Sequence, residues 1–324
     1  MKQMLIGKAL AVMLFALVLA AHGLSAAAGG EKKIGVLIFS EESRYEEAKK
    51  GILDELKAAG YGAPATTFIV EHAGANKAKA AELVRTFASA NMDLIFSLGT
   101  SMTIPVAREI KDVPIVFSVV YDPVDSGIAR DWKSSGNNTT GTSTRLPMAK
   151  VLNILHEFSA PKRLAVLYTP GEKNSETQLK DIKAAQTGGT LRIIPVPVTK
   201  KEEIAPILTE VLRTSDALYL TGSNLVDSQV AMIVDNAGRA NVVTITHLED
   251  LVEKGVLIGV CADSYNLGRL AGEKAVSILR GAKPSSIPIE TQKDLEVILN
   301  MQSLKAGRFT VPPKFRAMVT RIIE

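Results

Sequence analysis

The sequence predicts an α/β protein built as two doubly wound parallel-sheet lobes. Three observations support this fold class: short apolar strands alternate with amphipathic helical stretches, one strand-and-turn design occurs twice, and the chain has 324 residues, too many for one compact core. Apolar residues make up 46% of the chain and charged residues 22%, which is typical of a globular protein and not of a disordered one.

The elements follow in order from the residue pattern. Residues 34–39 form an apolar, β-branched run typical of a buried strand, and Tyr45, Ala48, Ile52 and Leu56 then recur at helical spacing. Helical stretches of about a dozen residues separate the later strands, which indicates parallel sheets with helices on both faces. Further strands are predicted at 67–70, 93–98, 113–119, 163–168, 191–196, 216–220, 242–246, 256–260 and 295–299.

One design recurs in the two halves of the chain. Residues 93–101 and 216–224 each begin with an acidic residue, continue as a buried strand and end in a polar turn that opens a helix. The strands at 34–39 and 114–118 have counterparts at 164–168 and 242–246. Chance similarity between buried strands is the alternative interpretation. Two copies of one open lobe would place the loops after their strands around a shared cleft, where such sheets bind ligands.

The N-terminus predicts a cleaved secretory signal peptide. Lys2 and Lys8 precede an apolar run over 9–21, which is shorter than the roughly 20 residues of a membrane-spanning helix, and Ala26–Ala28 fits an A-x-A cleavage site. An uncleaved anchor is the alternative. No cysteine lies near that site, which argues against a lipoprotein, and the lone Cys261 cannot form an internal disulfide. We therefore expect a soluble, periplasmic mature protein.

The net charge of +4 is spread over the whole chain, without a dense basic block. About half of this excess leaves with the two lysines of the signal peptide. Nucleic acid is therefore not an expected partner.

Polar side chains are concentrated in the loops that follow the predicted strands. Several of these residues also open helices, and Ser101, Asn174 and Asn224 are predicted N-caps. Exposed helix N-termini suit a carboxylate or another small anion. The alternative is that these residues only cap helices and form turns. The predicted ligand-binding residues are Ser40, Gly99, Thr100, Ser101, Tyr121, Asp122, Ser143, Asn174, Ser175, Ser223, Asn224 and Asp263.

The same loops contain side chains suited to a small zwitterion. Asp122 and Asp263 would be counter-charges for a ligand ammonium group, and Tyr121 or Tyr265 could stack on an aromatic part of the ligand. The loops therefore predict a site for a small polar molecule.

The sequence offers little evidence for a catalytic or metal-binding site. The histidines His22, His72, His156 and His247 lie outside metal-ligand spacing, and no G-x-S-x-G, H-E-x-x-H or Walker-type motif occurs. We expect no enzyme activity, metal or cofactor. His156 is predicted to lie on the surface, His247 is a candidate ligand contact at the cleft edge, and Cys261 is expected to be a buried, inert thiol.

Four segments together resemble a known family. Residues 121–124 (YDPV), 138–143 (NTTGTS), 167–175 (LYTPGEKNS) and 263–268 (DSYNLG) resemble, in order, stretches of the ABC-transporter substrate-binding proteins of the tryptophan/tyrosine-binding type. Many members have Ala-Thr-Pro where residues 98–101 read LGTS here, which leaves the identity of the ligand open.

The resemblance implies a type I periplasmic-binding fold, whose two lobes are joined by a three-crossover hinge. The crossovers are expected near 143–146, 262 and 289–293. This divides the chain into a signal peptide (1–28), lobe 1 (33–143 plus 263–290) and lobe 2 (146–261 plus 294–324). The residues that align with loops lining the family's cleft are Thr100, Ser101, Asp122, Asn174, Ser175, Ser223, Asn224 and Asp263.

We therefore expect an exported, monomeric solute-binding protein of an ABC importer. It would capture a small polar ligand, an aromatic or branched amino acid, by hinge closure and deliver it to a membrane permease. A ligand-sensing subunit that presents a small molecule to a membrane receptor is the alternative, and a hydrolase or transferase on the same scaffold is a third possibility.

Overall fold

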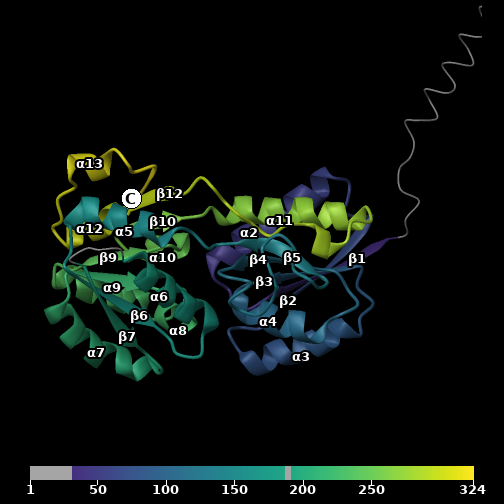
Figure 1. The fold of residues 1–324 in the computed structure, drawn as a ribbon, viewed down its shortest axis with the longest axis horizontal. Coiled ribbons are helices and arrows are strands. Elements are labelled where there is room, and N and C mark those ends of the chain that lie inside the picture. The colour runs from purple at the N-terminus through teal and green to yellow at the C-terminus, as the bar shows by residue number, and fades with distance from the viewer. Residues whose placement is uncertain (1–30, 187–190) are drawn as a thin grey trace, which may run out of the picture.

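Two α/β lobes lie side by side in the computed structural model, which describes residues 31–186 and 191–324 (Figure 1). The predicted signal peptide, residues 1–28, lies outside these described residues. Within them, each lobe consists of a central sheet covered by helices on both faces. No helix of the described part of the chain is long and apolar enough to cross a membrane.

Lobe 1 contains a parallel sheet with strand order β11-β5-β4-β3-β1-β2. Its strands are β1 (Lys32–Ile38), β2 (Thr66–His72), β3 (Leu94–Leu98), β4 (Ile115–Val120), β5 (Thr139–Ser143) and β11 (Glu290–Thr291). The helices are α2 (Ser43–Ala58), α3 (Lys77–Ala88), α4 (Thr100–Glu109), α11 (Ser264–Leu279) and the short 3-10 helix η1 (Pro284–Ser286).

Lobe 2 contains the sheet β13-β12-β10-β9-β8-β6-β7, in which only the β10–β12 pair is antiparallel among the described strands. Its strands are β6 (Arg163–Tyr168), β7 (Arg192–Pro197), β8 (Ala217–Leu220), β9 (Val243–Thr246), β10 (Ile258–Cys261), β12 (Glu296–Asn300) and β13 (Arg321–Ile323). The helices are α5 (Met148–Ser159), α6 (Lys173–Ala185), α7 (Lys201–Thr214), α8 (Asn224–Asp227), α9 (Val230–Arg239), α10 (Glu249–Glu253), α12 (Met301–Ala306) and α13 (Pro313–Arg316).

The two lobes share one topology, as the repeated design predicts. The order β2-β1-β3-β4-β5 in lobe 1 matches β7-β6-β8-β9-β10 in lobe 2. The acidic residue before β3, Asp93, accepts the backbone N–H of Lys33 at 2.8 Å, and its counterpart before β8, Asp216, accepts that of Arg163 at 2.9 Å. Each carboxylate therefore holds the start of the neighbouring first strand, which explains why the acidic residue recurs. The predicted fold class is confirmed.

The apolar strands are continuous because both faces of each sheet are buried. In β1, Val36 and Ile38 contact the core under α2 and α11, whereas Leu37 between them contacts the core under α3 and α4. All three side chains are fully buried. A parallel sheet covered on both faces has this pattern.

The chain passes between the lobes three times, through residues 144–147, 262–263 and 292–295. The second passage brings α11 back to lobe 1, where it packs along α2 (Figure 1). A Cβ atom added to Gly268 of α11 would lie 2.0 Å from the carbonyl oxygen of Ala48, and one added to Gly51 of α2 would lie 2.1 Å from that of Tyr265. Glycine at these two positions allows the backbones of the helices to touch.

The ten predicted strands are all present, but β5, β11 and β13 are not predicted by the apolar pattern. β5 has the sequence TTGTS, which has no large apolar side chain, yet all five residues are buried. The hydroxyl groups of Thr140 and Thr142 donate to the carbonyl oxygens of Ile287 and Leu267. Hydrogen bonds to distant backbone atoms therefore satisfy the buried hydroxyl groups of this strand. Its sequence lacks the apolar pattern by which the other strands are predicted. Cys261 at the end of β10 is buried, as predicted.

Candidate functional site

The carboxyl ends of the strands in both lobes face a small cavity between the lobes. Its volume is about 20 Å³, which is room for about one water molecule. Lobe 1 and the first crossover supply one wall and lobe 2 supplies the other. The lining residues are Arg44, Tyr45, Thr100, Val119, Tyr121 and Thr144 on one side, and Asn174, Gln178, Gly222, His247 and Leu248 on the other.

Ion pairs join the lobes around this cavity. Arg44 of α2 pairs with Asp250 of α10, and these side chains are 5% and 1% exposed. Asp125 of lobe 1 lies 2.9 Å from Lys173 and 2.8 Å from Lys180, both on α6 of lobe 2. The lobes are therefore closed onto each other in this structure.

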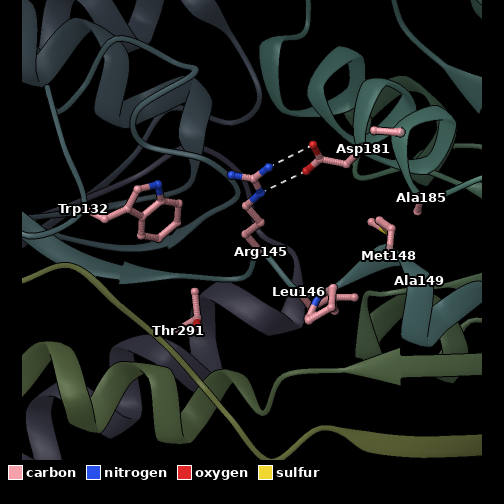
Figure 2. Close-up of a pocket in the computed structure, with 10 residues that line it drawn as sticks. Trp132, Arg145, Leu146, Met148, Ala149, Asp181, Ala185 and Thr291 are labelled. Carbon is pink, nitrogen blue, oxygen red and sulfur yellow. Dashed lines mark hydrogen bonds and ion pairs between the residues drawn. The ribbon is translucent and has the colours of Figure 1, made fainter.

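The first crossover carries a third connection between the lobes. Arg145 donates from Nε and from one terminal nitrogen to the two carboxylate oxygens of Asp181, both at 3.0 Å (Figure 2). Its other terminal nitrogen lies 2.7 Å from Asp122 of lobe 1. The hydroxyl group of Tyr121 also donates to Asp181, at 3.1 Å. A guanidinium group on the hinge thus bridges one acidic residue from each lobe, beside a hollow of about 560 Å³ lined in part by Trp132.

Two backbone features shape the wall that lobe 1 contributes. Gly99, the N-cap of α4, has φ +91°, and a Cβ atom there would lie 2.7 Å from the hydroxyl oxygen of Tyr45. Val119 has φ +56° next to an irregularity in the β4–β5 register. A positive φ is costly for a β-branched residue, and such strain is found where the fold aims side chains at a site.

His247, which follows β9, presents a polar atom without a protein partner to the cavity. Its Nδ1 lies 2.7 Å from the hydroxyl oxygen of Tyr219, whereas its buried Nε2 has no hydrogen-bond partner among the described residues. The ring packs edge to face on Tyr121, with centroids 5.3 Å apart. Burial, together with the charge of Arg44, lowers the pKa of His247 from 6.5 to about 3, so the ring is neutral.

Asn174 on α6 presents a second such atom. Its side-chain amide nitrogen donates to the carbonyl oxygen of Gly222, but its buried Oδ1 has no partner among the described residues. Buried polar groups without partners are rare and costly in folded proteins. The cavity therefore offers one ring nitrogen and one carbonyl oxygen to a bound molecule.

Three of the twelve sequence-predicted site residues, Thr100, Tyr121 and Asn174, line the cavity. The other nine do not line it. Ser175 accepts the backbone N–H of Thr169, and Ser143 donates to the carbonyl oxygen of Tyr121. Five more lie in the loops and helix starts that follow the strands: Ser40, which donates to Glu42; Gly99, already described; Ser101, the second residue of α4; Ser223, which contacts the hydroxyl group of Thr169; and Asn224, whose backbone N–H donates to Glu172.

The predicted helix caps are wrong by one or two residues. Gly99, Glu172 and Ser223 are the N-caps of α4, α6 and α8, in place of Ser101, Asn174 and Asn224. Each helix begins earlier than the sequence pattern suggests. This shift places Asn174 inside the first turn of α6, where its side chain reaches the cavity.

The two predicted counter-charges, Asp122 and Asp263, have other partners in the structure. Asp122 is 4% exposed, and its carboxylate pairs with Arg145 and accepts the backbone N–H groups of Val124 and Asp125. Asp263 caps α11 and faces a neighbouring hollow of about 560 Å³. The hydroxyl group of Tyr265 donates to Asp54 on α2. None of these three lines the central cavity. Two further residues do: His247, the candidate ligand contact at the cleft edge, and Arg44, which was not predicted.

Acidification is expected to open the lobes. In an open arrangement His247 reaches water and its pKa returns toward 6.5, so the open form takes up a proton more readily than the closed form. The ratio of closed to open protein therefore falls as the pH drops from 6.5 toward 3, and at about pH 5 it is about 30-fold lower than at neutral pH. Small-angle scattering at about pH 7.5 and about pH 5 measures this change as a larger radius of gyration.

The variant His247→Phe keeps the ring but removes the titrating nitrogen, and serves as the control for this pH dependence. The other cavity groups Arg44, Tyr45 and Tyr121 have raised pKa values, so Arg44 stays charged and the two tyrosines stay neutral over this range. An equal opening of His247→Phe at low pH would assign the effect to other groups.

A closed pair of lobes around a cavity to which both contribute is the arrangement of a two-lobed binding protein. The model of the ABC transporter substrate binding protein family matches residues 33–320, nearly all of the described chain. The protein belongs to this family. It is therefore a binding protein and not an enzyme.

Individual relatives support the same assignment. A tyrosine-binding protein of Clostridioides difficile (strain R20291) is 27% identical over 278 residues, which cover 85% of this chain and 81% of the relative. A solved structure of an ABC domain in complex with L-Trp from Streptococcus pneumonia is 25% identical, covers 91% of this chain and 100% of its own, and superposes with a TM-score of 0.85.

A third relative bears on the conformation. The ligand-free, open structure of a substrate-binding protein with adhesive properties from Clostridium difficile is 27% identical and covers 90% of this chain and 98% of its own, but its TM-score is 0.72. At similar identity and coverage, the present structure is closer to the ligand-bound relative than to the open one. This agrees with the ion pairs that join its lobes.

Proposed function

We propose that this protein is an exported solute-binding protein that captures an aromatic amino acid between its lobes and delivers it to an ABC permease. The observation that carries the proposal is the inter-lobe cavity, in which buried His247 Nε2 and Asn174 Oδ1 have no partner in the described chain. The names of the tyrosine- and L-Trp-binding relatives support the ligand class.

The lining of the cavity suits such a ligand. Arg44 supplies positive charge for a carboxylate, and Asn174 Oδ1 supplies an acceptor for an ammonium group. The rings of Tyr45, Tyr121 and His247 supply surfaces on which an aromatic side chain can pack. An amino acid with an aromatic side chain combines all three features.

Capture follows from lobe opening and closing. The closed cavity is far smaller than an amino acid, so the ligand enters when the lobes part. The lobes then close around it to a spacing wider than in this structure. Because both lobes supply contacts, the ligand binds the closed form better and shifts the hinge equilibrium toward it. The permease would recognise the closed pair of lobes.

Export is proposed from the sequence, and a permease partner is proposed from the family. The predicted signal peptide at 1–28 would carry the chain to the periplasm, where it would act as a monomer. Loss of labelled amino-acid uptake by cells that lack this protein, with recovery on re-expression, tests the importer role. Unchanged uptake together with normal binding in vitro would favour the sensing alternative.

L-Tryptophan or L-tyrosine is expected to stabilise the purified protein. A ligand that binds only the folded state adds about 2.7 kcal/mol at a hundredfold excess over its dissociation constant. Thermal melting and isothermal titration calorimetry measure the effect, with lysine and glutamate as ligands whose charged side chains do not suit the cavity. Equal responses to all amino acids, or no response to either aromatic one, would contradict the proposed ligand class.

A further inference from the structure

The ring of His247 is held from both sides. On one side the ring of Tyr219, from β8, is parallel to it within 5°, and the Tyr219 hydroxyl group contacts Nδ1 at 2.7 Å. On the other side Tyr121 of lobe 1 packs edge to face against it. His247 is 2% exposed and Tyr219 is fully buried. The ring therefore has one orientation, in which Nε2 is the nitrogen left for the cavity.

The contacts of Tyr219 decide which nitrogen of His247 carries the hydrogen. The only other partner of the Tyr219 hydroxyl group in the described chain is the thioether sulfur of Met148, at 3.9 Å. A thioether is a weak acceptor, whereas an unprotonated imidazole nitrogen is a strong one. Tyr219 therefore donates to Nδ1, and the single hydrogen of the neutral ring lies on Nε2. The tautomer is thus fixed by a neighbouring side chain, as in many histidine sites.

The cavity then contains a complementary pair. His247 Nε2–H is a donor without an acceptor, and Asn174 Oδ1 is an acceptor without a donor among the described residues. Arg44 lines the same cavity, but its guanidinium is already paired with Asp250. A carboxylate would find a free donor at His247 and positive charge at Arg44, and an ammonium group would find its acceptor at Asn174.

We propose that His247 determines specificity for the free carboxylate of the ligand through an Nε2–H donor, that Tyr219 is the positioning residue which fixes this tautomer, and that Asn174 Oδ1 accepts from the ligand ammonium group. This inference rests on the proposed function and names the residues that bind the carboxylate end and the ammonium end of its ligand. It predicts discrimination against amines that lack the carboxylate, because they leave the buried donor unpaired.

The test compares amino acids with their decarboxylated counterparts. Calorimetry on the whole protein measures binding of L-tryptophan and L-tyrosine against tryptamine and tyramine. The variant His247→Phe has an aromatic ring without the donor, so it is expected to weaken amino-acid binding by about 10- to 100-fold. Binding of the amines is expected to tighten or stay the same, because they no longer leave a buried donor unpaired. The matched control, His156→Phe on the exposed face of α5, is expected to leave all four affinities unchanged.

Nuclear magnetic resonance of the wild-type protein provides a readout that does not depend on a variant. With ¹⁵N-labelled histidine, the His247 ring is expected to show hydrogen on Nε2 in the liganded protein. Tyr219→Phe removes the hydroxyl group that fixes Nδ1, and is expected to mix the two tautomers and to lower amino-acid affinity about tenfold.

Three different results would contradict the proposed function, the role of His247 and the positioning role of Tyr219, respectively. Wild-type protein that binds neither amino acid contradicts the proposed function and this inference with it. Wild-type protein that binds the amino acids, with an unchanged amino-acid-to-amine ratio in His247→Phe, contradicts only the role of His247. Hydrogen on Nδ1 of the liganded wild-type ring contradicts the positioning role of Tyr219.

Discussion

Replacement of Asp250 by alanine is expected to open the lobes of the ligand-free protein. In the closed structure Asp250 is the inter-lobe partner of Arg44, and both side chains are almost fully buried. Removal of one member of a buried ion pair costs about 3–5 kcal/mol when the remaining charge has no other partner. Glu42, whose carboxylate lies 3.5 Å from the Arg44 guanidinium, compensates part of that charge, so we expect a cost near the lower end of this range. In the open form the Arg44 guanidinium is hydrated, so the loss of Asp250 does not destabilise that form. The ratio of closed to open protein is therefore expected to fall by about 10²-fold.

Small-angle scattering measures this opening as a larger radius of gyration without ligand. Asp235→Ala is the matched control, because it removes an acidic residue of the same lobe that pairs with Arg239 on the exposed face of α9. The double variant Arg44→Met with Asp250→Leu removes both buried charges and is expected to close better than Asp250→Ala alone. If Asp250→Ala scatters like the wild type, the ion pair does not hold the lobes together.

Gly268→Ala is expected to lower the stability of lobe 1 even though alanine favours helices more than glycine does. The added Cβ atom would lie 2.0 Å from the carbonyl oxygen of Ala48, a backbone atom that no side-chain rotation can move away. α2 and α11 must separate, and overpacking of this kind costs about 3 kcal/mol. For a domain of this size we expect the melting temperature to fall by about 6–12 °C.

Gly238→Ala on α9 is the matched control for this substitution. A Cβ atom at Gly238 has only the backbone nitrogen of Gly307 within reach, at 3.9 Å. Helix propensity then acts alone and is expected to stabilise the protein by up to about 1 kcal/mol. The two Gly→Ala changes should therefore shift the melting temperature in opposite directions. A stabilising effect of Gly268→Ala would mean that the two helices do not touch as the structure has them.

Much of the fold was predictable because its pattern is local. The ten predicted strands are runs of apolar residues, and burial on both faces of a parallel sheet produces such runs wherever they occur. β5 was missed because its stability comes from hydroxyl groups that bond the backbone at Ile287 and Leu267, far along the chain. The cap of α4 was misplaced because Gly99 adopts φ +91° against Tyr45, a contact between separate elements.

The candidate site was predictable only to the level of its loops. Thr100, Tyr121 and Asn174 follow predicted strands and do line the cavity. His247 also follows a predicted strand, and this position made it a candidate ligand contact; it does line the cavity. Arg44 carries no such signal, because a basic residue in the first turn of an amphipathic helix usually faces solvent.

The sequence by itself determined the α/β fold class, the repeat of the two lobes and several of the loops that line the cavity, because each of these depends on residues close together in the chain. Only the tertiary structure decided which side chains meet. Arg44 and Asp250 are about 200 residues apart, and the crossovers alone bring them into contact. Whether a polar atom is paired or free for a ligand depends on such contacts, as His247 and Asp122 show, and therefore cannot be determined from local sequence.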